Sequence, residues 1–105
     1  MNLNIYILYM RFVSLEPSTR PDKKYMIQFD EPKKVIHFGS KNSRTYLDHK
    51  DKKKRFNYLR RHSVNEDWDN PLSAGALSAY LLWGFSTDLR KNLEYFLRYF
   101  NIHPS

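Results

Sequence analysis

Basic side chains crowd into one short stretch of this sequence, and their chemistry is that of an anion-binding surface. Residues 48–62 carry seven Lys or Arg against two acids, whereas residues 63–105 carry three against five. On a helix, Lys52 and Arg55 would share a face with Lys41 or Arg44 from the preceding loop, and such a face could grip phosphates. The predicted partner-binding residues are Lys41, Arg44, Lys50, Lys52, Lys53, Lys54, Arg55, Arg60 and Arg61.

Two tyrosines, Tyr46 and Tyr58, lie beside these cations and could stack on exposed bases or sugars. No recognised nucleic-acid motif with base-reading residues is present, so the pattern does not support sequence-specific readout. A nucleic acid and an acidic protein surface would both suit it. The alternative is a solvated helix face that keeps the protein soluble.

Residue sets that could catalyse a reaction are scarce. The four histidines, at positions 37, 49, 62 and 103, include no His-x-x-x-His pair, and there is no cysteine for thiolate chemistry. One acidic loop could hold a divalent metal as in a nuclease, although capping and pairing with the neighbouring basic helix is the commoner role of such residues. Its members are His62, Asn65, Glu66, Asp67 and Asp69. We therefore predict no enzyme, no cofactor, no metal site and no small-molecule substrate.

Four aromatic residues follow the basic stretch and allow two interpretations. Trp68, Tyr80, Trp83 and Phe85 could form an aromatic recognition cage. Aromatic residues this dense among leucines are more often part of a hydrophobic core, and we favour that interpretation.

Length and composition limit the class of protein. The chain has 105 residues, a mass of 12.7 kDa, 41% hydrophobic and 28% charged residues, so it predicts one folded domain and not a disordered polyelectrolyte. A net charge of +7 favours acidic partners. The apolar run of residues 5–10 ends at Arg11, too short for a membrane span, and it lacks the flanks of a secretory signal. An intracellular or virion-internal location is the resulting expectation.

The elements that must position these side chains are a hairpin and about three helices. Alternating apolar residues predict strands over 24–29 and 35–38, joined as an antiparallel hairpin. Helices are predicted over 48–62 with Asp48 as N-cap, over 74–83 with Ser73 as N-cap, and after a cap at Ser86 or Thr87. The last helix carries an apolar stripe formed by Leu89, Leu93, Phe96, Leu97 and Phe100.

The domain organisation follows from the prolines near the N-terminus. Residues 16–23 contain two prolines and no large apolar residue, which is typical of a linker. We therefore predict an N-terminal strand or arm with its linker over residues 1–23 and a compact α+β domain over residues 24–105. The fold class is α+β, with the hairpin packed on about three helices.

Several short motifs follow one another along the chain, namely Lys24–Phe29, His37-Phe38-Gly39, His49-Lys50-Asp51, Arg61-His62, Asn65-Glu66-Asp67-Trp68, Pro71, Ala74-Gly75-Ala76-Leu77-Ser78 and Leu81-Leu82-Trp83. In this order they resemble a family of small, basic, uncharacterised proteins of nucleocytoplasmic large DNA viruses, or giant viruses. The resemblance covers about residues 24–100. It implies a large DNA virus as the source and a protein made in, or packaged from, a cytoplasmic viral factory. It implies no activity.

Three hypotheses of function follow. The first is a non-enzymatic virion component, a minor capsid or core protein that contacts nucleic acid or an acidic viral protein through its basic residues. The second is a nucleic-acid-binding accessory factor in viral transcription, replication or packaging. The third is a metal-dependent nuclease built on His62 and Glu66–Asp69.

Overall fold

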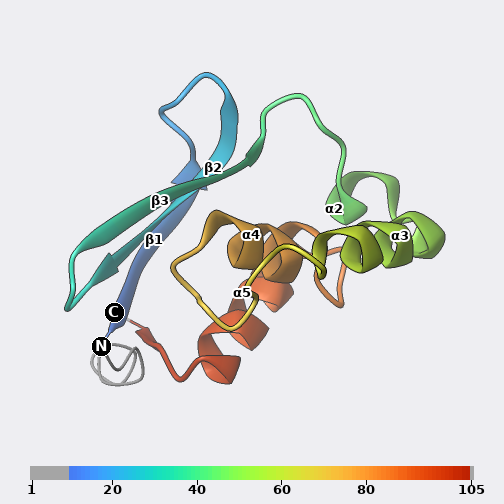
Figure 1. The fold of residues 1–105 in the computed structure, drawn as a ribbon. Coiled ribbons are helices and arrows are strands. Elements are labelled where there is room, and N and C mark those ends of the chain that lie inside the picture. The colour runs from blue at the N-terminus through green and yellow to red at the C-terminus, as the bar shows by residue number, and fades with distance from the viewer. Residues whose placement is uncertain (1–9, 105) are drawn as a thin grey trace.

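The computed structural model describes residues 10–104 and packs a four-stranded sheet against helices, which confirms the predicted α+β class. The strands are β1 (Arg11–Pro17), β2 (Lys23–Asp30), β3 (Lys34–Ser40) and β4 (His103–Pro104), in the spatial order β3-β2-β1-β4. The helices are α2 (Tyr46–His49), α3 (Lys52–His62), α4 (Ala74–Leu77), the π-helix η1 (Ser78–Leu82) and α5 (Leu89–Tyr99). In Figure 1 the three long strands form a curved ribbon at one side and the helices gather at the other. None of the helices in this part of the chain has the length and apolar character that crossing a bilayer requires.

The predicted hairpin is confirmed by strands β2 and β3, which pair antiparallel from Lys23 opposite Ser40 to Phe29 opposite Lys34. Ile27 and Phe29 of β2 and Phe38 of β3 are buried, whereas their neighbours Met26 and Gln28 are only partly covered. This alternation is the period-two pattern of strands with one face on a core. The hairpin therefore supplies one wall of the hydrophobic interior.

The linker predicted over residues 16–23 is instead the end of β1 and a tight connection into β2. Pro17 lies opposite Tyr25 in the antiparallel β1–β2 pair, and the amide of Ser18 donates to the carbonyl of Lys24 at 3.0 Å. Proline is tolerated at the end of a strand, so its presence could not distinguish a hairpin turn from a linker. β1 and β2 belong to one sheet, and the part of the predicted N-terminal strand that falls on residues 1–9 lies outside the described residues.

The helix predicted over residues 48–62 is divided in two, and its predicted cap is wrong. Thr45 is the N-cap of α2, and the carboxylate of Asp48 turns back to accept from the Thr45 amide at 2.7 Å. Lys50 then adopts a left-handed conformation with φ 57° and ends this turn. α3 starts afresh at Asp51, whose carboxylate accepts from the amides of Lys53 and Lys54.

The helix predicted over residues 74–83 begins as expected but changes its winding. The Ser73 hydroxyl accepts from the amide of Ala76, which confirms this residue as the N-cap of α4. The chain continues as the π-helix η1, and its last bond joins the Trp83 amide to the Ser78 carbonyl. For α5 the cap is Asp88, which accepts from the Arg90 amide, so the predicted caps Ser86 and Thr87 are wrong.

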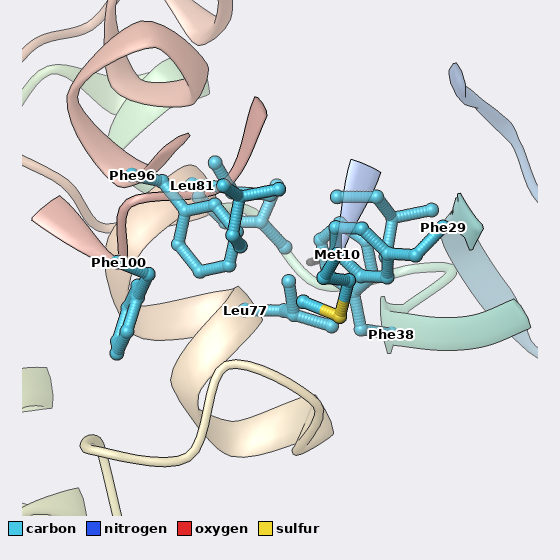
Figure 2. Close-up of a cluster of buried hydrophobic side chains, with 10 residues drawn as sticks. Met10, Phe29, Phe38, Leu77, Leu81, Phe96 and Phe100 are labelled. Atoms are coloured by element: carbon cyan, nitrogen blue, oxygen red, sulfur yellow. The ribbon is translucent and has the colours of Figure 1, made fainter. Parts of the chain in front are cut away.

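The hydrophobic core lies between the sheet and the pair formed by η1 and α5. Figure 2 shows side chains from the sheet meeting side chains from the helices. Ten buried residues form this cluster, namely Met10, Ile27, Phe29, Phe38, Leu77, Leu81, Leu82, Phe96, Phe100 and Ile102. The apolar stripe predicted for α5 faces this core. Burial of that stripe holds the helix against the sheet, although its opposite side carries charged residues.

One fully buried polar side chain, Asn92 of α5, holds the turn that follows η1. Its amide nitrogen donates to the carbonyls of Leu81 at 3.0 Å and Ser86 at 2.8 Å, and its oxygen accepts from the Ser86 amide at 3.0 Å. Gly84 packs directly on this amide, because a Cβ there would lie 2.7 Å from Asn92 Cγ. The turn is therefore fixed by hydrogen bonds that satisfy its own backbone.

Candidate nucleic-acid interface

Most of the predicted partner-binding cations lie on α3 and on the loop that leads to α2. Eight of the nine are exposed, and among residues 10–104 none of these eight makes an ion pair. We call them the exposed basic set, which consists of Lys41, Arg44, Lys50, Lys52, Lys53, Lys54, Arg60 and Arg61. Helix α3 contains no fully buried residue, so it presents most of its surface to solvent. Its charges are free to meet an external anion.

Arg55, the ninth predicted cation, is used inside the fold. Its Nε donates to the carbonyl oxygens of Trp83 at 3.0 Å and Gly84 at 2.8 Å, just after the end of η1. Its guanidinium also lies over the ring of Tyr46, 5.6 Å from the centroid. Arg55 therefore anchors α3 to the turn after η1 and does not belong to the exposed basic set.

The two tyrosines predicted to stack on bases are occupied within the protein. Tyr46 is buried, with 6% of its surface exposed. Tyr58 lies between two rings, with Trp83 parallel to it at 4.1 Å and His62 at 4.0 Å between centroids. Burial and the nearby Glu66 carboxylate raise the pKa of Tyr58 to about 12, so its hydroxyl stays protonated at neutral pH. Neither tyrosine has a free face for a base.

A groove of about 560 Å³ runs beside the ring stack, between the end of the β2–β3 hairpin, α3 and α4. We call it the Arg44–Arg61 groove, after the two arginines of the exposed basic set that line it. Lys23 at the start of β2 lines it as well. These cations come from three separate elements, and the fold alone brings them together. The remaining lining includes Ser40, Ser43, Tyr58, His62, Glu66, Gly75 and Trp83.

Glu66 is the one carboxylate among the residues that line this groove, and both of its oxygens are engaged. Oε2 lies 2.8 Å from His62 Nδ1, and Oε1 accepts from the Trp68 indole at 3.0 Å. Gly75 permits this arrangement, since a Cβ there would lie 3.0 to 3.2 Å from the Glu66 side chain. A carboxylate can only accept hydrogen bonds, so the Nδ1 of His62 carries a proton and its Nε2 is left for other contacts.

The acidic loop does not assemble the predicted nuclease site. Within residues 10–104 no group of three or more His, Cys, Asp or Glu side chains is placed to hold a metal ion. Asp67 instead accepts from the Asp69 amide at 3.0 Å, and Glu66 is committed to His62 and Trp68. The metal-dependent nuclease hypothesis therefore has no ligand cluster in the described residues.

The four aromatic residues considered for a cage do not form one together. Trp68, Tyr80 and Phe85 line a separate cavity of about 480 Å³, whereas Trp83 lines the Arg44–Arg61 groove. Tyr80 and Trp83 pack against the hydrophobic core, as the core interpretation predicts. That interpretation is wrong for Phe85, which is 58% exposed, and Trp68 is not among the residues packed on the core.

Lys23 is the one cation among the residues lining the groove that the sequence did not point to. It lies opposite Ser40 at the end of the β2–β3 pair, next to the loop that carries Lys41 and Arg44. Extending the predicted hairpin by one residue at this end would have placed Lys23 beside that loop. Charge density along the sequence could not show this, because the lysine lies far from the basic stretch in the chain.

Comparison with known proteins gives one match. Residues 13–62 are similar to the model of a family described as "Family of unknown function (DUF5754)". The similarity runs from β1 to the end of α3 and includes the whole exposed basic set. No curated protein and no solved structure matches the chain.

Proposed function

We propose that the protein is a non-enzymatic module that binds the phosphate backbone of nucleic acid through its exposed basic set. The observation that supports this most directly is eight exposed Lys and Arg side chains, on α3 and the loop before it, without ion-pair partners among residues 10–104. Surface charges kept only for solubility do not need to cluster in one part of the fold. Cations gathered in this way attract a polyanion and release its counterions on binding.

The start of α3 gives a second line of support. Lys52, Lys53 and Lys54 occupy its first turn, where positive charge opposes the helix dipole. This arrangement makes the helix less stable than an acidic first turn would. Because the fold does not benefit from these lysines, we attribute them to an external partner.

In the viral setting implied by the resemblance, the module is a virion component that contacts packaged nucleic acid, in a minor capsid or core position. A nucleic-acid-binding accessory factor would use the same surface, and quantitative analysis of purified particles distinguishes the two roles. A virion component is present at a fixed copy number per particle. An accessory factor is abundant in infected cytoplasm and depleted from particles.

Affinity for duplex DNA, measured between about 50 and 200 mM salt, tests the binding proposal. We expect log Kd to rise steeply with log salt concentration. The variant carrying Lys52→Gln, Lys53→Gln and Lys54→Gln should bind more weakly on every sequence, and its slope should fall by up to about 0.9 for each phosphate contact removed.

The matched control removes the same charge elsewhere. Lys33, Lys34 and Lys91 are exposed and lie on the β2–β3 turn, at the start of β3 and on α5, outside α3. Their triple Gln variant should keep most of the salt slope. Equal losses of DNA affinity in the two triple variants would contradict an α3 interface. If an acidic protein displaces the bound DNA readily, and excess DNA does not displace the bound acidic protein, the surface belongs to a protein partner.

A further inference from the structure

The Arg44–Arg61 groove has the size and chemistry of a small-ligand site. Its volume of about 560 Å³ falls within the range of about 300–1,000 Å³ that is usual for such pockets. It is lined by cations, hydroxyls and aromatic rings, whereas the cavity beside Trp68 and Phe85 is lined mostly by apolar groups and a single arginine.

The charge of the groove selects an anionic group. Lys23, Arg44 and Arg61 line it, and arginine donors in particular match the oxygens of a phosphate. Glu66 could repel an anion, but its two oxygens already accept from His62 and Trp68. The groove therefore has more donors than its own residues can satisfy.

The ring of His62 adds a flat surface beside these cations. One of its faces is covered by Tyr58, with the two planes 24° apart, while 37% of the His62 side chain is exposed. Since His62 also lines the groove, its uncovered surface is open to a ligand there. Glu66 holds one edge of the ring at Nδ1 and Tyr58 covers one face, so a planar group can stack on the fixed ring at little cost in side-chain entropy.

We propose that the Arg44–Arg61 groove holds one unpaired nucleotide of a nucleic-acid strand, with its phosphate on Arg44 and Arg61 and its base against the ring of His62. This inference rests on the proposed function and gives it a substrate class, because it predicts a preference for single strands. A base within a duplex must first leave its stack to enter the groove. Attraction by charge alone predicts the opposite preference, since a duplex releases more counterions per phosphate contact than a single strand.

The test compares a ten-nucleotide single strand with a blunt ten-base-pair duplex at the same salt concentration. We expect the single strand to bind about tenfold more tightly. The double variant Arg44→Gln with Arg61→Gln should reduce this ratio to about one. The control variant Lys53→Gln with Arg60→Gln removes the same charge from α3 outside the groove, and it should weaken both complexes while leaving the ratio unchanged.

The possible results separate this inference from the proposed function. Salt-dependent binding with a wild-type ratio of one or less would overturn the groove assignment and leave the proposed function intact. Loss of the ratio to the same degree in both double variants would also overturn it. A nucleoside 5′-monophosphate and an unlabelled strand can each be used to displace the bound single strand. If they displace it equally well at the same concentration of nucleotide units, the site binds free nucleotides and the strand assignment is wrong. No binding to either nucleic acid would refute the proposed function itself.

Discussion

Replacing Arg55 with methionine separates a structural role from a binding role for this residue. Methionine keeps most of the apolar stem and removes the guanidinium. The Nε of Arg55 has a single hydrogen, which is shared between the carbonyls of Trp83 at 3.0 Å and Gly84 at 2.8 Å, so the two contacts count as one charged hydrogen bond. Such a bond contributes about 1.5–3 kcal/mol, and the contact with the Tyr46 ring adds about 0.5–1 kcal/mol.

We therefore expect Arg55→Met to lower the free energy of unfolding by about 2–4 kcal/mol. For a domain of this size the same change lowers Tm by at least about 8 °C. Urea denaturation followed by tryptophan fluorescence measures it. The control Lys53→Met removes an exposed charge from the same helix and should change the free energy of unfolding by no more than about 0.5 kcal/mol.

The opposite pattern would refute this reasoning. If Arg55→Met unfolds at the same urea concentration as the wild type but binds nucleic acid more weakly, Arg55 contacts the partner and its bonds to the turn after η1 contribute little. If Arg55→Met is less stable and also binds more weakly, its affinity must be measured at a temperature and urea concentration well below its unfolding midpoint, where all of the variant is folded. Under that condition we expect its affinity to approach that of the wild type.

Three further changes test other parts of the fold. Asn92→Ala leaves the buried carbonyl of Leu81 and the partly buried amide and carbonyl of Ser86 without their side-chain partner, and we expect it to cost about 2–4 kcal/mol in urea denaturation. Gly84→Ala would drive a Cβ into the carbonyl of Tyr80 and the Asn92 amide, so it should cost about 3 kcal/mol or more and be visible as a loss of Tm by circular dichroism. In an ultraviolet titration Tyr58 should ionise near pH 12, against an ordinary value of 10.0. Because the folded state keeps this proton where the unfolded state loses it, stability should fall as pH rises from about 10 to about 12, and Tyr58→Phe should remove that part of the fall.

Local patterns predicted the elements whose signals lie within a few residues. Alternation gave the β2–β3 hairpin, and the stripe from Leu89 to Phe100 gave the buried face of α5. The cap at Ser73 was also correct. The cap at Asp48 was wrong because Thr45, Asp48 and Asp51 all have the chemistry of a cap within seven residues. Propensity alone does not decide among such neighbours.

The candidate site depended on contacts that no local pattern contains. Arg55 was assigned to a binding surface because of its charged neighbours, but its partners, Trp83 and Gly84, are 28 and 29 residues away. Tyr58 is likewise covered by Trp83, a partner that is distant in the sequence. The π-helix that places these carbonyls and the indole is not encoded by any spacing rule that we could apply. The sequence therefore placed most of the cations of α3 on its surface, but it did not show which residues join two elements.

The stack of Trp83, Tyr58 and His62 also equips the protein with its own optical signal. The Trp83 and Tyr58 rings are 3° from parallel, and the imidazole follows at 4.0 Å from Tyr58. Aromatic chromophores held this rigidly in a chiral setting produce circular dichroism in the near ultraviolet, which vanishes when tertiary packing is lost. The same stack borders the Arg44–Arg61 groove, so a molecule that enters the groove changes the surroundings of Trp83. Occupancy can then be followed in unlabelled protein at the long-wavelength edge of the indole band, beyond most of the absorbance of the nucleotides themselves.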